Sequence, residues 1–193
     1  FYAITLCLFA FLVLINFNYF TIIMALGSMP LAFTYPLMKR YTYWPQLFLG
    51  ITFNYGLILG WTSISGQLDM IPIIFYFGAI FWTLGYDTVY GFQDIKDDEI
   101  IGLKSTSIKF KGTAKLFLIL CYLILIISFA LGGYFMGFNL FYFLFLIIPL
   151  IHLFFYQIKI FNIKKPSTCL KIFKSNNYLG FIILINIFLG KTL

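Results

Sequence analysis

The fold is decided by the run MIPIIFYFGAIFWTLGYDT at residues 70–88, which is almost entirely apolar until it reaches Asp87. A helix needs about 20 such residues to cross the hydrocarbon core of a bilayer. Backbone groups find no water in that core, so a spanning segment must satisfy its own hydrogen bonds as a helix. The run also lacks the alternation of polar and apolar residues that is typical of a membrane β-barrel. Residues 70–88 are therefore predicted to form a transmembrane helix.

Similar apolar runs continue along the chain in both directions. They cover residues 1–16, 20–38, 46–64, 114–135, 138–157 and 177–193. The 193-residue chain is 62% hydrophobic and 10% charged, with a mean hydropathy of +0.99. A soluble domain carries about 25% charged residues, which excludes that class here. We predict an all-α fold, a polytopic bundle of seven transmembrane helices that forms a single domain over residues 1–193.

Basic side chains are confined to alternate connections between these runs. The connections near residues 17–19, 65–69 and 136–138 contain no lysine or arginine, and only Lys191 breaks the pattern. The basic connections contain Lys39, Arg40, Lys96, Lys104, Lys109, Lys111, Lys115, Lys159, Lys164, Lys165, Lys171 and Lys174. The positive-inside rule places these three connections in the cytoplasm. Membrane topology thus accounts for the net charge of +7, and no nucleic-acid partner is expected.

Five of the six acidic residues gather at and just beyond the end of residues 70–88. They are Asp87, Asp94, Asp97, Asp98 and Glu99. Ionisable side chains are costly beside hydrocarbon, so such a concentration at the end of a span indicates a functional site. The single histidine, His152, lies inside an apolar run and is expected to pack there rather than to act.

A stripe of carboxylates would form if the helix of residues 70–88 continued through residue 99. Asp87, Asp94 and Asp98 would then point within about 40° of one another. Carboxylate oxygens suit Mg²⁺, which is usually completed by waters and by phosphate oxygens of a substrate. Asp94 and Asp98, one turn apart, could share an ion. Asp87, ~10 Å farther along the axis, suits a second ion or a supporting role.

Possible partners for a phosphate follow this acidic segment. Gly102 permits a chain reversal, and Lys104 with the hydroxyls of Ser105 and Thr106 offers donors suited to phosphate oxygens. Lys39 and Arg40 belong to a connection on the same predicted face of the membrane. We therefore interpret this region as the diphosphate end of a substrate site.

Several motifs together resemble the UbiA superfamily of membrane prenyltransferases. YDTVY at residues 86–90, the DxxDD pattern at 94–98 and GLKST at 102–106 resemble its second aspartate-rich motif. YPLMKRYT at 35–42, PQ at 45–46, LG at 49–50 and NNYxG at 176–180 resemble its 4-hydroxybenzoate polyprenyltransferase branch. The resemblance extends over essentially the whole chain.

This resemblance implies nine transmembrane helices around a cavity open to lipid, with two aspartate-rich motifs that bind a prenyl diphosphate through Mg²⁺. Seven helices would be present, whereas the first two and the first motif, NDxxDxxxD, are absent. We therefore expect an N-terminally truncated chain that is inactive alone. The implied catalytic and metal-binding residues are Asp87, Asp94 and Asp98. The implied diphosphate-binding residues are Arg40, Lys104 and Lys39.

The implied reaction is the Mg²⁺-dependent transfer of a polyprenyl group from an allylic diphosphate to the ring of 4-hydroxybenzoate, in ubiquinone biosynthesis. Tyr86 and Tyr90 are expected to stabilise the allylic cation through their ring faces. The expected partners are a prenyl diphosphate, a small aromatic acceptor and membrane lipid. We expect an integral protein of the bacterial inner membrane whose active site faces the cytoplasm.

Other functions compete with this one. The acceptor could instead be haem, a naphthoate or homogentisate. A transporter or channel could use the same carboxylates to bind cations, although transport sites usually lie near the bilayer midplane on broken helices. A purely structural membrane protein would not need acidic residues concentrated at one rim.

Overall fold

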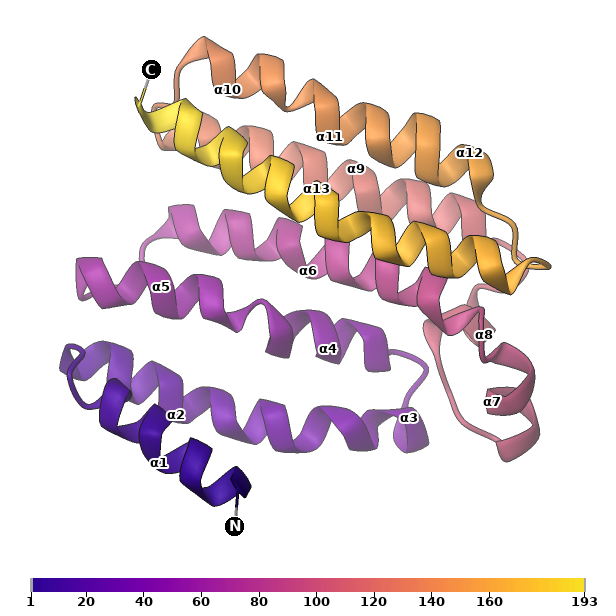
Figure 1. The fold of residues 1–193 in the computed structure, drawn as a ribbon, viewed down its shortest axis with the longest axis horizontal. Helices are drawn as coiled ribbons and strands as arrows, with labels where there is room; N and C mark the ends of the chain where they lie inside the picture. The colour runs from indigo at the N-terminus through magenta and orange to yellow at the C-terminus, as the bar shows by residue number, and fades with distance from the viewer. Residues whose placement is uncertain (1, 193) are drawn as a thin grey trace.

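The computed structural model describes residues 2–192, which form helices and connecting turns without a β-strand among them (Figure 1). The elements are α1 (Tyr2–Leu14), α2 (Tyr19–Thr34), the 3₁₀ helix η1 (Tyr35–Leu37), α3 (Met38–Tyr41), α4 (Pro45–Phe53), α5 (Tyr55–Ser65), α6 (Met70–Gly91), α7 (Ile95–Ile101), α8 (Thr106–Lys109), α9 (Ala114–Phe135), α10 (Leu140–Phe145), α11 (Ile147–Ile151), the π-helix η2 (His152–Gln157), α12 (Ile158–Ile160) and α13 (Pro166–Thr192).

Six helical segments in this range are long and apolar enough to cross a membrane. They are Tyr19–Tyr41, Pro45–Ser65, Met70–Gly91, Ala114–Phe135, Leu140–Ile160 and Pro166–Lys191. The prediction of an all-α membrane bundle is confirmed, with two corrections. α1 has 13 residues, fewer than a full span requires. The last helix begins at Pro166 rather than at residue 177, so its first turns are formed by residues that precede the apolar run. Residues 1 and 193, at the outer ends of two predicted spans, lie outside the described part.

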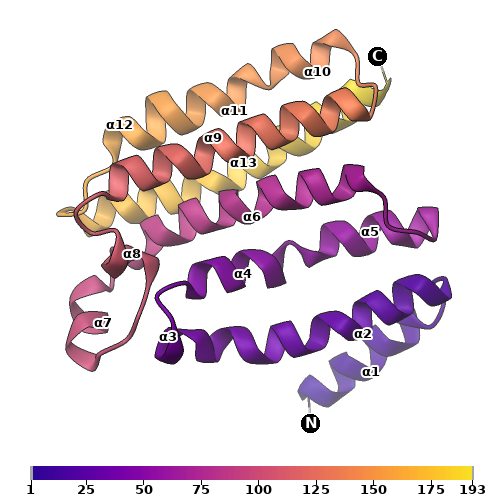
Figure 2. The same cartoon turned by 180° about the vertical axis from the view of Figure 1, so that it is seen from behind.

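The core lies where α6 and α9 pack together, with α13 and the α10–α12 segment beside them (Figures 1 and 2). Small residues allow α6 to approach α9 closely, as is common between membrane helices. A Cβ atom at Gly85 would stand 2.7 Å from the ring of Tyr122, and one at Gly78 would stand 2.8 Å from Cβ of Ser128. α4 and α5 lie on the other side of α6, and α2 lies beyond them.

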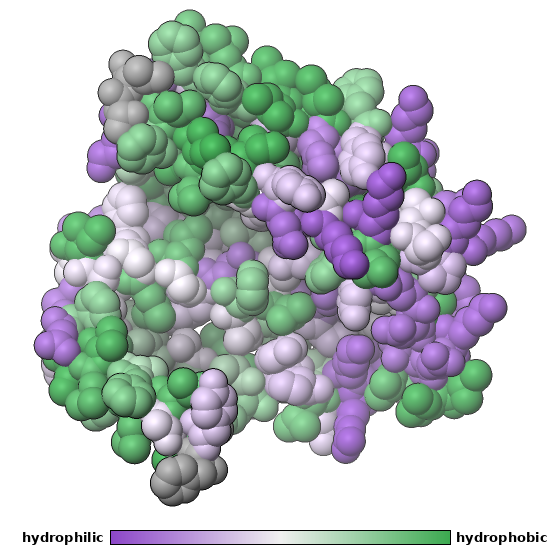
Figure 3. All heavy atoms as spheres, in the orientation of Figure 1, coloured by the Kyte–Doolittle hydropathy of each residue, from purple (hydrophilic) through white to green (hydrophobic). Residues whose placement is uncertain are grey.

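All three basic connections lie at the same end of the bundle. α3, α7, α8 and the turn between α12 and α13 meet there, whereas the C-terminal end of α13 lies at the opposite end (Figures 1 and 2). Hydrophilic side chains gather over that end, and most of the remaining visible surface is apolar (Figure 3). This arrangement matches the alternation of charge along the chain and brings the acidic segment to the polar end.

Candidate active site

The acidic segment bends away from the long helix that precedes it. α6 ends at Gly91, and α7 begins at Ile95 in a new direction (Figure 1). Between them, the Phe92 side chain is 1% exposed and its ring centroid lies 5.6 Å from that of Phe161. Burial of this aromatic ring therefore turns the chain at the end of α6. The prediction of one carboxylate stripe along a continuous helix is wrong.

The three candidate carboxylates come from two helices. Asp87 is half-buried near the end of α6, while Asp94 precedes α7 and is exposed. The amide of Asp98 donates to the Asp94 carbonyl oxygen at 2.9 Å, so these two residues lie one helical turn apart. Asp98 is only 7% exposed. A nearly buried carboxylate needs a cation or hydrogen-bond donors close by.

Lys39 of α3 supplies positive charge at both Asp98 and Asp87. Its Nζ lies 3.9 Å from Oδ2 of Asp98. Lys39 and Asp87 also line one cavity of about 270 Å³ between α4, α6 and the η1–α3 segment. The remaining lining residues are Tyr35, Pro36, Pro45, Gln46 and Leu49. Tertiary structure thus places a lysine from one basic connection beside carboxylates from another.

Lys104 reaches the same region through a tight reversal of the chain. Gly102 ends α7 with a φ of +77°, a left-handed conformation that favours glycine. The Lys104 amide then donates to the Lys39 carbonyl oxygen at 2.8 Å, and its Nζ donates to the Tyr41 carbonyl oxygen at 3.2 Å. Arg40 lies next to Lys39, is exposed and forms no ion pair with any residue in the described part of the chain. The three predicted diphosphate-binding cations therefore gather at one place.

The hydroxyls of the two residues that follow Lys104 are buried. The Ser105 hydroxyl caps α8 by accepting a hydrogen bond from the Ile108 amide at 3.2 Å. The Thr106 hydroxyl lies 2.6 Å from that of Thr88 on α6, and both side chains are buried. The prediction that Ser105 and Thr106 donate to phosphate is wrong, because both side chains are buried where α8 begins and packs on α6.

Two further residues, Gln46 and Ser107, fix this segment in place, and neither was assigned a role from sequence. Oε1 of the buried Gln46 accepts a hydrogen bond from the Thr106 amide at 3.0 Å. The Ser107 hydroxyl donates to the Thr88 carbonyl oxygen at 2.7 Å. A polar residue opening the apolar run at 46–64 is the signal that could have identified Gln46.

Tyr86 and Tyr90 form an aromatic wall together with α13. The centroid of the Phe173 ring lies 5.7 Å from that of Tyr86 and 4.6 Å from that of Tyr90. Trp82 packs edge-on against Tyr86 at 6.1 Å, and its indole N–H donates to Oδ1 of Asn176 at 2.8 Å. Asn176 belongs to the NNYxG motif, so this hydrogen bond connects that motif of α13 to α6.

The donors present are suited to Mg²⁺, although they do not form a complete metal cage. Within residues 2–192, no three Asp, Glu, His or Cys side chains converge on a common point. Mg²⁺ is commonly held by one or two carboxylates together with waters and phosphate oxygens of the substrate. Asp94 and Asp98, one turn apart and with Lys39 beside Asp98, are the pair that fits this requirement.

Comparison with known proteins now gives these residues a family. The sequence pattern of the UbiA prenyltransferase family matches residues 1–185, nearly the whole chain. The chain belongs to the UbiA prenyltransferase family. Its relatives include the mitochondrial 4-hydroxybenzoate polyprenyltransferases of Bos taurus and Homo sapiens, each 42% identical over 180 residues. A 4-hydroxybenzoate geranyltransferase 2 from Lithospermum erythrorhizon is 38% identical over 180 residues.

These alignments cover nearly all of this chain but only part of each relative. The alignments span 93% of this chain but 48% of the bovine and human proteins and 58% of the Lithospermum protein. The chain therefore spans about half the length of the curated relatives it matches. A solved structure from work on digeranylgeranylglyceryl phosphate synthase superposes with a TM-score of 0.71 at 20% identity, covering 91% of this chain and 63% of that one. That likeness establishes the same helical fold.

Proposed function

We propose that the full-length protein transfers a polyprenyl group from an allylic diphosphate to 4-hydroxybenzoate, and that the described helices supply its second aspartate-rich motif. The 42% identity to 4-hydroxybenzoate polyprenyltransferases supports this acceptor. The observation that carries the proposal is the meeting of Asp98 with Lys39, 3.9 Å apart, where Asp87, Arg40 and Lys104 also gather. Carboxylates with adjacent cations are what a metal diphosphate requires.

The residues of this chain divide the work by their charge. Asp94 and Asp98 would hold Mg²⁺, which when bound withdraws charge from the diphosphate oxygens. Lys39, Arg40 and Lys104 stabilise the negative charge that grows on the leaving group, an interaction that strengthens as the transition state forms. Asp87 faces Lys39 across the shared cavity and keeps that ammonium oriented.

The reaction breaks the bond between the allylic carbon and the diphosphate oxygen, and the electron pair leaves with the diphosphate. The allylic cation is stabilised by aromatic ring faces, for which Tyr86 and Tyr90 are the candidates, each contributing ~0.5–2 kcal/mol. The ring carbon beside the phenol hydroxyl then forms the new carbon–carbon bond. Loss of the proton from that carbon, to the diphosphate or to water, restores aromaticity.

The membrane location follows from the substrate. A polyprenyl tail can stay in lipid while its diphosphate reaches the polar end of the bundle. The bacterial inner membrane and an active site facing the cytoplasm stay predictions. The bovine and human relatives are named as mitochondrial proteins.

The decisive experiment is an assay of the full-length protein in phospholipid vesicles. The protein is supplied with geranyl diphosphate, 4-hydroxybenzoate and Mg²⁺, and the product is identified by mass spectrometry. We expect a prenylated 4-hydroxybenzoate whose formation stops with EDTA. Homogentisate and 1,4-dihydroxy-2-naphthoate serve as parallel acceptors, and preferential prenylation of either would overturn the assignment of 4-hydroxybenzoate.

The rival transporter function has its own test in the same vesicles. Cation flux without any prenyl donor, together with no product from any acceptor, would contradict prenyl transfer. The α6–α7 carboxylates lie at the end of the bundle rather than at mid-depth, which favours the transferase.

A further inference from the structure

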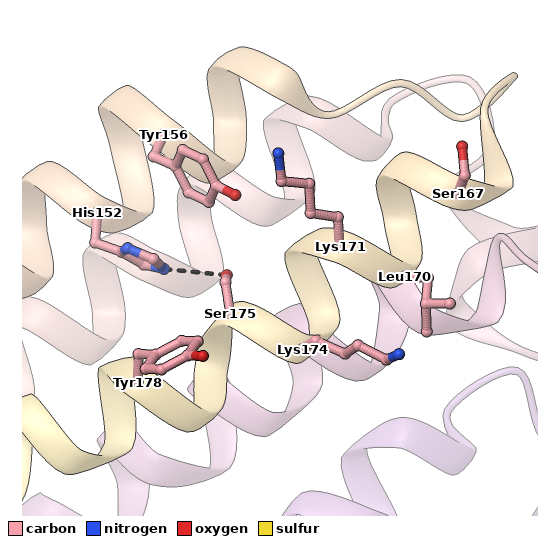
Figure 4. Close-up of a pocket in the computed structure, with 8 residues that line it drawn as sticks. All are labelled: His152, Tyr156, Ser167, Leu170, Lys171, Lys174, Ser175 and Tyr178. Atoms are coloured by element: carbon pink, nitrogen blue, oxygen red, sulfur yellow. Dashed lines mark hydrogen bonds between the residues drawn. The ribbon is translucent and has the colours of Figure 1, made fainter.

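A second cavity, to which several polar side chains contribute, lies between the π-helix η2 and the first turns of α13. Its volume is about 490 Å³. It is lined by His152, Tyr156, Ser167, Leu170, Lys171, Lys174, Ser175 and Tyr178, which Figure 4 shows in detail. Lys171 lies about 160° around α13 from Phe173, the residue that contacts Tyr86 and Tyr90. The cavity therefore faces away from the aromatic wall of the candidate active site.

The residues that line the cavity include several hydrogen-bond donors and two lysines but no carboxylate. Lys171 and Lys174 are exposed, lie three residues apart, and form no ion pair with any described residue. The sequence has no acidic residue after Glu99. Like charges this close on a helix repel each other. An anion between them would remove the repulsion and would accept hydrogen bonds from nearby hydroxyls.

The floor of the cavity is fixed by a buried polar network. Nε2 of His152 lies 3.1 Å from the Ser175 hydroxyl, which donates to the Ile172 carbonyl oxygen at 2.7 Å (Figure 4). Nε2 of the buried Gln157 lies 3.3 Å from the same hydroxyl, and its Oε1 accepts from the Tyr122 hydroxyl at 2.6 Å. Short π-helices often mark functional sites, and here η2 turns His152 and Tyr156 toward α13.

The surroundings of the cavity change from polar to apolar along the helices. Its basic end lies at the end of the bundle where the basic connections gather. One turn of helix from His152, Ile148 is 43% exposed, and two turns from Tyr178, Ile185 is 41% exposed. A ligand that matches both parts has an anionic head at the interface and an apolar tail in the bilayer.

We propose that this cavity binds the phosphate headgroup of an anionic membrane lipid. Lys171 and Lys174 contact the phosphate, the hydroxyls of Tyr156, Tyr178 and Ser167 donate to its oxygens, and the acyl chains lie along Ile148 and Ile185. Basic pockets between transmembrane helices at the cytoplasmic face are suited to such headgroups. The proposal does not depend on the proposed function, because none of the predicted catalytic residues lines this cavity.

Native mass spectrometry of the full-length protein in neutral detergent tests this proposal. The protein is titrated with phosphatidylglycerol, and separately with phosphatidylcholine of the same acyl chains. We expect one phosphatidylglycerol to bind more tightly than phosphatidylcholine. The double variant Lys171→Gln/Lys174→Gln should weaken that binding about twenty-fivefold, about fivefold for each lysine. Both side chains are exposed, so the variant keeps the fold, which an unchanged thermal midpoint without anionic lipid verifies.

The matched control is Lys159→Gln/Lys165→Gln, which removes two exposed lysines at the same end of the bundle that do not line the cavity. We expect less than a twofold change in this variant. An equal loss of phosphatidylglycerol affinity in both double variants would mean that the lipid is attracted by the overall positive charge of this end of the bundle, and would overturn the proposal. Displacement of the lipid by millimolar inorganic phosphate would identify a free-anion site instead. Displacement by geranyl diphosphate at low micromolar concentration would assign the cavity to the prenyl donor.

Discussion

Two lysine-containing segments lie at the same end of this bundle and differ in what balances their charge: residues 87–111, the mixed segment, and residues 159–174, the basic segment. The mixed segment contains five carboxylates and four lysines, and the structure pairs its Asp98 with Lys39 of α3 at 3.9 Å and its Glu99 with its own Lys111 at 2.7 Å. Residues 159–174 contain five lysines and no acidic residue. The first segment is therefore nearly neutral where it meets α6, whereas the second stays strongly positive.

This difference teaches what each segment can bind. Carboxylates beside cations can take a metal together with its diphosphate, because both signs of charge find a partner. Lysines alone attract an anion directly, without a metal. The positive-inside rule explains why lysines are present in both segments, but it does not distinguish their roles.

The largest expected effect comes from removing a carboxylate of the mixed segment. Asp98→Asn in the full-length protein should lower prenyl transfer on the order of a hundredfold or more, because the proposed Mg²⁺ site would lose a ligand and Lys39 would lose its partner. Initial rates at a series of Mg²⁺ concentrations measure the loss.

Asp97→Asn is the matched control, since Asp97 is exposed on the same short helix. It should leave the rate within about twofold. If Asp98→Asn retained the normal Mg²⁺-dependent rate, the assignment of Asp98 as a metal ligand would be wrong. The mixed and basic segments would then no longer differ in what they are proposed to bind.

A smaller effect is expected from removing a single cation of α3, beside the mixed segment. Arg40→Ala should raise the KM for the prenyl diphosphate about tenfold, because one charge-assisted contact with the phosphate is lost. The KM for 4-hydroxybenzoate should not change. Steady-state kinetics with each substrate varied in turn separates the two constants. Lys159→Ala, in the basic segment, should change neither, and a higher KM for the phenol alone would refute the role of Arg40.

The packing of the mixed segment on α6 can be weakened without changing any charged residue. A Cβ atom at Gly91 would collide with Oγ of Ser107, so Gly91→Ala should displace the hydroxyl that donates to the Thr88 carbonyl oxygen. We expect a loss of about 1–2 kcal/mol in the free energy of unfolding. Thermal unfolding in lipid nanodiscs measures it. Gly112→Ala, with no heavy atom within 4 Å of its added Cβ, should be tolerated, and equal midpoints for the two variants would contradict the packing of α8 on α6.

The smallest effect should come from the outer ion pair of the mixed segment. Glu99→Gln removes the partner of Lys111, but both side chains are substantially exposed. Such pairs contribute ~0–1 kcal/mol, so the thermal midpoint should fall by no more than about 2 °C, and less in high salt. A midpoint loss comparable with that of Gly91→Ala would show that charge pairing, rather than packing, holds the segment.

The sequence by itself determined the class of fold and the end of the bundle at which the acidic segment lies. Runs such as residues 114–135 have no stable alternative to helix in a bilayer, and the spacing of lysines fixes which connections share a side. The resemblance carried by residues 86–106 also led to the family that comparison established. These are local properties, read from hydropathy, charge and motif.

Only the tertiary structure decided how the candidate residues meet. Burial of Phe92 ended α6 early and separated Asp87 from Asp98, and Lys39 came between them from a connection 48 positions before Asp87. Neither the burial of Thr106 nor the position of Lys171 beside η2 can be predicted from the sequence. Each depends on which distant helix lies alongside, and hydropathy along one segment contains no information about its neighbours.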